Sequence, residues 1–149
     1  MRVSEAMTRH CEAVGMNESI RAAAQRMREK DIGALFVSDD KGGISGIITD
    51  RDIAVRAVAD GADANAQVGR YMTKDVISCF EDDDLEDAIR TMEDQRIRRL
   101  MVCDRNKRPV GMLSQADIAR VLGRRARLAG EVLHEISQPG GPHSQSAHH

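Results

Sequence analysis

The spacing of apolar and polar residues predicts one series of elements that occurs twice along the chain. In the first part, apolar residues recur at helical spacing from Ile20 to Met27. The polar residues Asn17, Glu18 and Ser19 lie just before them, so we expect a capped amphipathic helix over about residues 18–30. The pattern then predicts a buried strand, a polar turn, a second strand and a second helix, at residues 34–38, 39–43, 44–49 and 50–59.

The second part of the chain repeats this order. Acidic residues 81–84 open a helix that carries Leu85 and Met92, and carboxylates there suit the positive end of the helix dipole. A short leading strand is expected ahead of each series, near Ala13 and Ile77. The pattern further predicts a strand, a turn, a strand and a long helix, at residues 100–103, 104–109, 110–114 and 115 to about 137.

The two parts are related in sequence at a constant offset of 65 residues. Residues 3–54 laid over residues 68–119 give thirteen identities without a gap. The identical pairs are Val3/Val68, Met7/Met72, Thr8/Thr73, Ala23/Ala88, Met27/Met92, Ile32/Ile97, Leu35/Leu100, Val37/Val102, Asp39/Asp104, Gly46/Gly111, Asp52/Asp117, Ile53/Ile118 and Ala54/Ala119. Two copies are too few for a solenoid. They predict a single domain with pseudo-two-fold symmetry and a pair of clefts where the copies meet.

This order predicts an α/β (α+β) fold of two pseudo-symmetric repeats, because one copy alone has too little apolar surface. Two sheets packed face to face with helices outside would bury the apolar faces of both. The expected segments are repeat 1, a linker, repeat 2, a helical extension and a disordered tail, at residues 1–61, 62–67, 68–123, 124–137 and 138–149. The extension has an apolar stripe with arginines mainly off it. It either caps its own domain or, as we favour, contributes to self-association.

Composition narrows the function classes. The chain has 149 residues and a net charge of −2, which gives no electrostatic footprint for nucleic acid. No apolar run is long enough to span a bilayer, and the first residues lack a signal-peptide pattern, so we expect a cytoplasmic protein. Three cysteines without C-x-x-C spacing, and the isolated pair His10–Cys11, give little reason to expect a metal site.

The strongest local motif lies where a strand meets a helix, and it occurs in both copies: glycine, two apolar residues, a hydroxyl residue, two variable residues and aspartate. The hydroxyl residue and aspartate are Thr49 and Asp52 in the first copy, and Ser114 and Asp117 in the second. One interpretation is purely structural, since this spacing forms a capping box. The other is a ligand site, because a carboxylate can accept hydrogen bonds from both hydroxyls of a ribose diol while the helix N-terminus faces a phosphate.

The chain resembles the cystathionine-β-synthase (CBS) domain, which occurs in tandem as a Bateman module. The resemblance covers residues 2–122 and looks closest to stand-alone bacterial modules of the hypoxic-response type. The stretches that carry it are residues 3–8, 31–37 and 46–53 in the first copy, and 68–73, 97–104 and 111–118 in the second. The family usually has proline after the leucine of the first core strand. This chain has Phe36 and Met101 there, which restore a backbone donor and add bulk.

The resemblance implies two ligand clefts, each built from both copies. The first cleft would contain Thr49, Asp52, Thr73, Val76, Ile77, Ile97, Arg98 and Arg99. The second would contain Ser114, Asp117, Thr8, Cys11, Glu12, Ile32, Gly33 and Ala34. Arg98 and Arg99 could hold a phosphate or pair with a surface carboxylate, whereas Gly33 and Ala34 offer no charge. We therefore rank the first cleft higher for a phosphorylated ligand.

Three functions follow for comparison. The first is a non-catalytic sensor, in which AMP, ADP, ATP or another adenosyl compound acts as a regulatory ligand, no cofactor is required, and a homodimer transmits the signal to a protein partner. The second is a ligand-free structural or stress-response module. The third, an enzyme, has little support, because no catalytic triad, phosphate loop or metal cluster is suggested.

Overall fold

The structure is a computed structural model that describes the chain from residue 1 to residue 136, with side chains to residue 131. The predicted tail, residues 138–149, lies outside the described residues. The elements of the first repeat are η1 (Val3–Glu5), β1 (Thr8–Arg9), β2 (Ala13–Gly15), α1 (Ile20–Lys30), β3 (Ala34–Ser38), β4 (Ile44–Thr49) and η2 (Asp52–Val58). Those of the second are α2 (Val68–Tyr71), β5 (Ser78–Phe80), α3 (Leu85–Gln95), β6 (Arg99–Cys103), β7 (Pro109–Ser114) and α4 (Gln115–Ile136).

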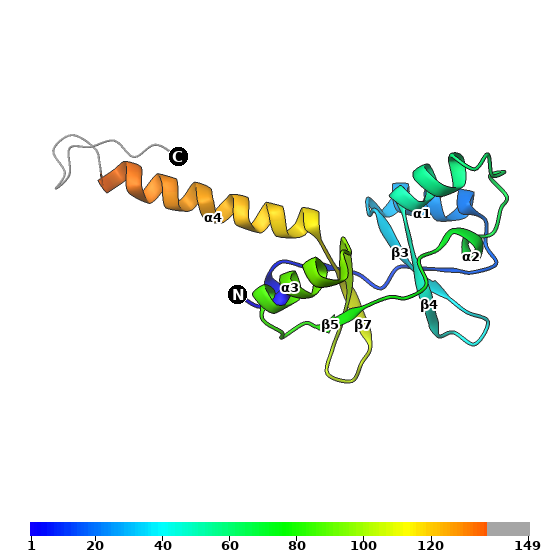
Figure 1. Ribbon diagram of the computed structural model, residues 1–149, viewed down its shortest axis with the longest axis horizontal. Coiled ribbons are helices and arrows are strands. Elements are labelled where there is room, and N and C mark those ends of the chain that lie inside the picture. The colour runs from blue at the N-terminus through cyan, green and yellow to red at the C-terminus, as the bar shows by residue number, and fades with distance from the viewer. Residues whose placement is uncertain (137–149) are drawn as a thin grey trace.

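Two sheets with helices outside them form the body of the molecule, which confirms the predicted fold class (Figure 1). One sheet has the order β2-β3-β4 and the other β1-β7-β6-β5. Phe36 and Ile47 of the first repeat meet Met112 of the second in an apolar layer of their own. The backbone donors that Phe36 and Met101 restore are used: Phe36 N–H donates to the Glu12 carbonyl (3.1 Å) and Met101 N–H to that of Ile77 (3.0 Å).

The leading segment of each repeat packs on the other repeat. Val3 belongs to the apolar core beneath α3, and β1 pairs antiparallel with β7. Reciprocally, Val68 and Tyr71 belong to the core beneath α1, and Thr73 forms a β-bridge with Ile47. The two halves are therefore joined by an exchange of segments, which brings residues from both copies to each cleft.

The second helix of the first repeat differs from its expected form. The pattern predicts an ordinary helix over residues 50–59, whereas Asp52–Val58 is a π-helix, with wider turns. The repeat offset pairs Arg56 with the buried Val121, so an α-helix would turn a charged residue towards the core. The wider turn shifts the buried position by one residue. Ala57 is therefore fully buried instead of Arg56, and the Arg56 guanidinium donates to the Tyr71 carbonyl at 3.0 Å.

The long α4 helix runs away from the body of the molecule (Figure 1). Asp117 and Val121 at its start are buried, but Leu122 and Leu128 are 51% and 61% exposed. No helix within residues 1–136 is long and apolar enough to cross a membrane.

Candidate functional site

Both motif aspartates are held by the capping box that the sequence predicts. Thr49 N–H donates to Asp52 Oδ2 (3.0 Å), and Asp52 N–H donates to Thr49 Oγ1 (2.9 Å). Ser114 and Asp117 form the same pair of bonds, at 3.0 and 3.1 Å. All four residues are buried. The structural interpretation of the motif is thus confirmed, and each aspartate keeps one carboxylate oxygen, Oδ1, for other partners.

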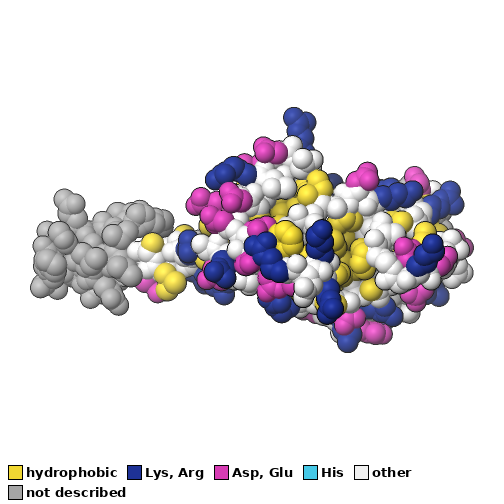
Figure 2. Space-filling view, turned by 90° about the horizontal axis from the view of Figure 1, so that it is seen from below, with side chains coloured by type: hydrophobic (Ala, Val, Ile, Leu, Met, Phe, Trp, Pro, Cys, Tyr) yellow, Lys and Arg dark blue, Asp and Glu magenta, His cyan; other side chains and the backbone are white. Residues whose placement is uncertain are grey.

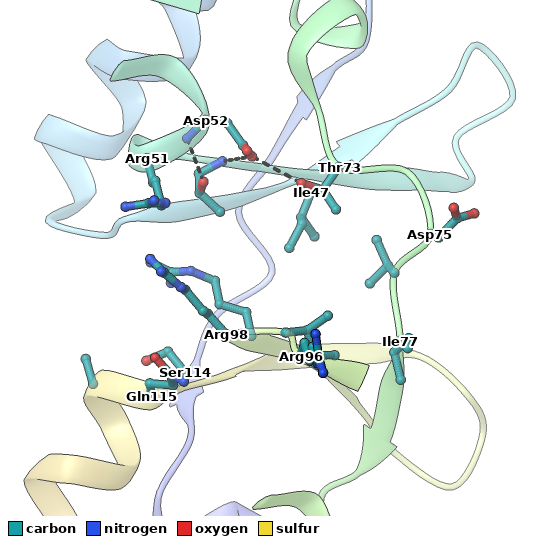
Figure 3. A pocket seen from close by; sticks show the side chains of 15 residues that line it. Ile47, Arg51, Asp52, Thr73, Asp75, Ile77, Arg96, Arg98, Ser114 and Gln115 are labelled. Atoms are coloured by element: carbon teal, nitrogen blue, oxygen red, sulfur yellow. Dashed lines mark hydrogen bonds between the residues drawn. The ribbon is translucent and has the colours of Figure 1, made fainter. Parts of the chain in front are cut away.

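The first cleft has a volume of about 420 Å³, within the usual range for small-molecule sites. It is lined by all eight residues that we assigned to it: Thr49, Asp52, Thr73, Val76, Ile77, Ile97, Arg98 and Arg99. Figure 3 shows Asp52 and Thr73 on one wall and Arg98 on the wall opposite. The structure adds Ile47, Arg51, Asp75, Arg96, Ser114, Gln115 and Ala116. Arg51 could have been predicted as a lining residue from the sequence, because it occupies one of the two variable positions of the repeat motif.

The second cleft is smaller, about 210 Å³. It brings together six of its eight assigned residues: Thr8, Ile32, Gly33, Ala34, Ser114 and Asp117. Cys11 and Glu12 do not line it, because Cys11 Sγ lies 3.1 Å from the Pro109 carbonyl oxygen and Glu12 forms an ion pair with Lys30 (3.7 Å). The residues that sequence reasoning missed are His10, Asp31, Arg99, Met112 and Ala116.

The two aspartates differ in how far their Oδ1 atoms are already engaged. Asp117 Oδ1 accepts bonds from Arg120 at 2.7 Å and from Thr8 Oγ1 at 2.9 Å. Among the side chains that the structure describes, only Arg56 pairs with Asp52 Oδ1, at the long distance of 3.8 Å, while Thr73 Oγ1 lies 3.4 Å from the other oxygen. The Asp52 carboxylate is therefore the more available of the two to accept hydrogen bonds from a ligand.

The neighbouring arginines also take different places. Arg99 forms an ion pair with Asp50 (3.8 Å) and lines both clefts. The sequence suggested that the second cleft carries no charge near Gly33. The structure differs, because a Cβ added at Gly33 would lie 3.4 Å from the Arg99 guanidinium. Its half-buried His10 has a lowered pKa, because burial disfavours the imidazolium and Arg99 repels it, although Glu12 opposes the shift.

The sequence of each repeat matches the CBS domain, at residues 3–58 and 68–124. The chain therefore belongs to the CBS domain family, as its motifs indicated. Among its relatives, hypoxic response protein 1 of Mycobacterium tuberculosis is 38% identical over 110 residues, which cover 73% of this chain and 76% of that protein. The CBS domain-containing protein YhcV of Bacillus subtilis is 36% identical over 117 residues, covering 78% and 82%.

Solved structures share the fold. The CBS domain pair of protein MJ0100, in complex with 5′-methylthioadenosine and S-adenosyl-L-methionine, has a TM-score of 0.72 and 29% identity over 84% of this chain and 98% of that one. Hypoxic Response Protein I with two coordinated zinc ions has a TM-score of 0.64 and 35% identity over 80% and 98%. Within the residues described here, no group of three or more His, Cys, Asp or Glu side chains could hold a metal ion, so we assign no zinc site to them.

Proposed function

We propose that this protein is a non-catalytic regulatory CBS pair that binds an adenine nucleotide in the first cleft. The observation that carries the proposal is the buried Asp52 carboxylate, which lines the cavity of about 420 Å³ and whose Oδ1 has no short hydrogen bond from the described part of the chain. A ribose diol would supply the missing donors. The adenosyl ligands of the MJ0100 domain pair support the ligand class.

A homodimer would transmit the binding signal. Leu122 and Leu128 are exposed on the projecting α4 helix, and Val58 at the end of η2 is 64% exposed. Apolar side chains also gather on the middle of the body between charged ends (Figure 2). Surfaces of this kind mark protein contacts, and a ligand that favours one arrangement of two chains would shift their equilibrium. A ligand-free interaction module remains the second candidate, and the same exposed surface supports it.

A thermal-shift screen tests the ligand, with light scattering on the same samples to test for the dimer. AMP, ADP, ATP, NAD and S-adenosylmethionine are each added to the full chain. At a concentration of about 100 times Kd, binding adds about 2.7 kcal/mol, which corresponds to about 5–10 °C in Tm. Asp52→Ala should remove most of this shift, whereas the matched variant Asp117→Ala should retain it. If none of these compounds raises Tm at millimolar concentration, the sensor proposal is wrong and the interaction module is favoured.

A further inference from the structure

The Asp117 carboxylate in the second cleft has most of its hydrogen-bonding capacity already in use. A carboxylate offers about four lone-pair positions, two on each oxygen. Asp117 Oδ1 accepts from Arg120 (2.7 Å) and from Thr8 Oγ1 (2.9 Å). Asp117 Oδ2 accepts from Ser114 N–H (3.0 Å). Described residues therefore leave about one acceptor position, whereas a ribose diol donates two hydrogen bonds.

The Asp52 carboxylate in the first cleft has the opposite balance. Its Oδ2 accepts from Thr49 N–H (3.0 Å) and lies 3.4 Å from Thr73 Oγ1 (Figure 3). Among the described side chains, only Arg56 approaches Oδ1, and 3.8 Å is too long for a hydrogen bond. Within this part of the chain, both lone pairs of Oδ1 stay open to a diol. Asp117 would have to lose a partner before it could do the same.

Arg120 is the partner that distinguishes the two carboxylates. The threonine and the capping box occur in both repeats, at positions related by the offset of 65 residues. At the same offset Arg120 corresponds to Val55, which cannot donate a hydrogen bond from its side chain. The Arg120 side chain is 55% exposed, whereas that of Asp117 is 6% exposed. Arg120 therefore reaches the buried carboxylate from the surface, and it can be replaced without changing the core.

The other charged groups of the second cleft do not take over this role. Arg99 lines both clefts, and its guanidinium forms an ion pair with Asp50 at 3.8 Å. Asp31 and His10 also line the second cleft. Among the hydrogen bonds and ion pairs of the described residues, none joins these groups to Asp117. Because the Arg99 charge stays in the second cleft whatever happens at Arg120, an uncharged ligand is needed to test the carboxylate alone.

We infer that Arg120 is a specificity-determining residue that closes the second cleft to ribonucleosides by occupying the Asp117 carboxylate. The inference rests on the proposed function, in which Asp52 binds the ribose diol, and adds that the unchanged chain binds one such ligand instead of two. Removal of Arg120 frees one acceptor position on Oδ1. Together with the open position on Oδ2, Asp117 can then accept both hydroxyls of a diol.

Calorimetric titration of the full chain with adenosine tests the role of Arg120, because adenosine carries the diol without a phosphate. We expect one site per chain in the unchanged protein and two in Arg120→Val, which copies the residue of the first repeat. A charge-assisted bond of this kind corresponds to about ten- to hundredfold in affinity, so adenosine binding in the second cleft should tighten by that factor. Arg124→Val, one turn further along the exposed part of α4, is the matched control and should keep one site.

Two further measurements assign the new site to the Asp117 carboxylate. Adding Asp117→Ala to Arg120→Val should remove it again, and 2′-deoxyadenosine, which lacks one hydroxyl of the diol, should not fill it. The Tm of each variant without ligand shows whether it is folded. Arg120→Ala, with the best helix-forming residue at the same position, gives the same test if the valine variant does not fold.

The number of adenosine sites decides the inference separately from the proposed function. Two sites in the unchanged protein would overturn the inference and leave the proposed function standing. So would a single site in a folded Arg120 variant, if the unchanged protein also has one. If neither the unchanged protein nor a folded Arg120 variant binds adenosine, the inference is wrong, and the thermal shift with AMP decides the proposed function by itself. A site that appears only without Arg120 and disappears with Asp117→Ala supports the inference.

Discussion

Replacing Gly46 by alanine should disrupt the contact that carries Thr73 to the first cleft. Gly46 lies in β4 where the exchanged segment crosses it, and an added Cβ would press into the Thr73 carbonyl group, with its carbon at 3.3 Å and Met72 Sδ at 3.1 Å. The adjoining bridge consists of two hydrogen bonds, from Ile47 N–H to the Thr73 carbonyl (3.0 Å) and from Thr73 N–H to the Ile47 carbonyl (2.8 Å). The methyl group has room only if that backbone moves.

The size of the effect follows from these contacts. Losing both bridge hydrogen bonds costs about 2 kcal/mol, and retaining them under overpacking costs about 1–3 kcal/mol. Depending on the response, the free energy of unfolding falls by about 1–3 kcal/mol, or Tm by about 2–12 °C for a chain of this length. Because Thr73 would move away from Asp52, the Tm increase caused by AMP should also shrink. Circular dichroism melts with and without AMP measure both quantities.

Gly123→Ala is the matched control, because nothing lies within 4 Å of a Cβ added there. Gly123 lies inside α4, where alanine is the better helix former by about 1 kcal/mol, so the variant should not lower Tm. If Gly46→Ala melts within about 1 °C of the unchanged protein and responds to AMP as it does, the exchanged segment does not position Thr73 as argued.

Burial raises the pKa of Cys79 to about 12, with Asp83 and Cys103 adding to the shift, so its thiolate fraction at pH 8 is about 10⁻⁴. Iodoacetamide at pH 8 should label the exposed Cys11 well before Cys79, as mass spectrometry would show, and equal labelling rates would contradict this. Because folding lowers the pKa of His10 below its ordinary 6.5, the unfolded chain binds the proton more strongly and stability should fall as the pH drops below about 6.5. His10→Gln should flatten the dependence of Tm on pH between 7 and 5. If the slope of Tm against pH is unchanged, other titratable groups and not His10 cause the dependence.

The hydrophobic pattern predicted the regular elements well, because their cause is local. The strands at residues 34–38 and 44–49 are found as expected, and α1 is a capped helix as expected, with Ser19 as its N-cap. The recurrence of glycine at positions 46 and 111 was visible in the sequence, but its reason was not. In each repeat the glycine faces the carbonyl of a threonine, Thr73 or Thr8, that only the tertiary exchange brings near.

Side-chain placement in the clefts was predicted less completely than the fold. The resemblance located the walls of the first cleft, because apolar and hydroxyl residues are fixed by the backbone of their strands. The resemblance did not predict which of Arg98 and Arg99 forms an ion pair. The partner of a long charged side chain depends on which opposite charges the fold brings near it. Arg99 forms an ion pair with Asp50 of the other repeat, and this pairing depends on tertiary packing.

The difference between the two clefts follows from one helical turn. In α4, Arg120 stands three residues after Asp117 and its guanidinium lies 2.7 Å from the carboxylate. In η2, the arginine stands four residues after Asp52, and the wide turn carries Arg56 to the Tyr71 carbonyl, 3.8 Å from the carboxylate. The same type of residue therefore neutralises one aspartate closely and leaves the other open. At the repeat offset Val55 takes the place of Arg120, so the sequence of η2, together with its wide turn, leaves the first cleft the more open to a ligand.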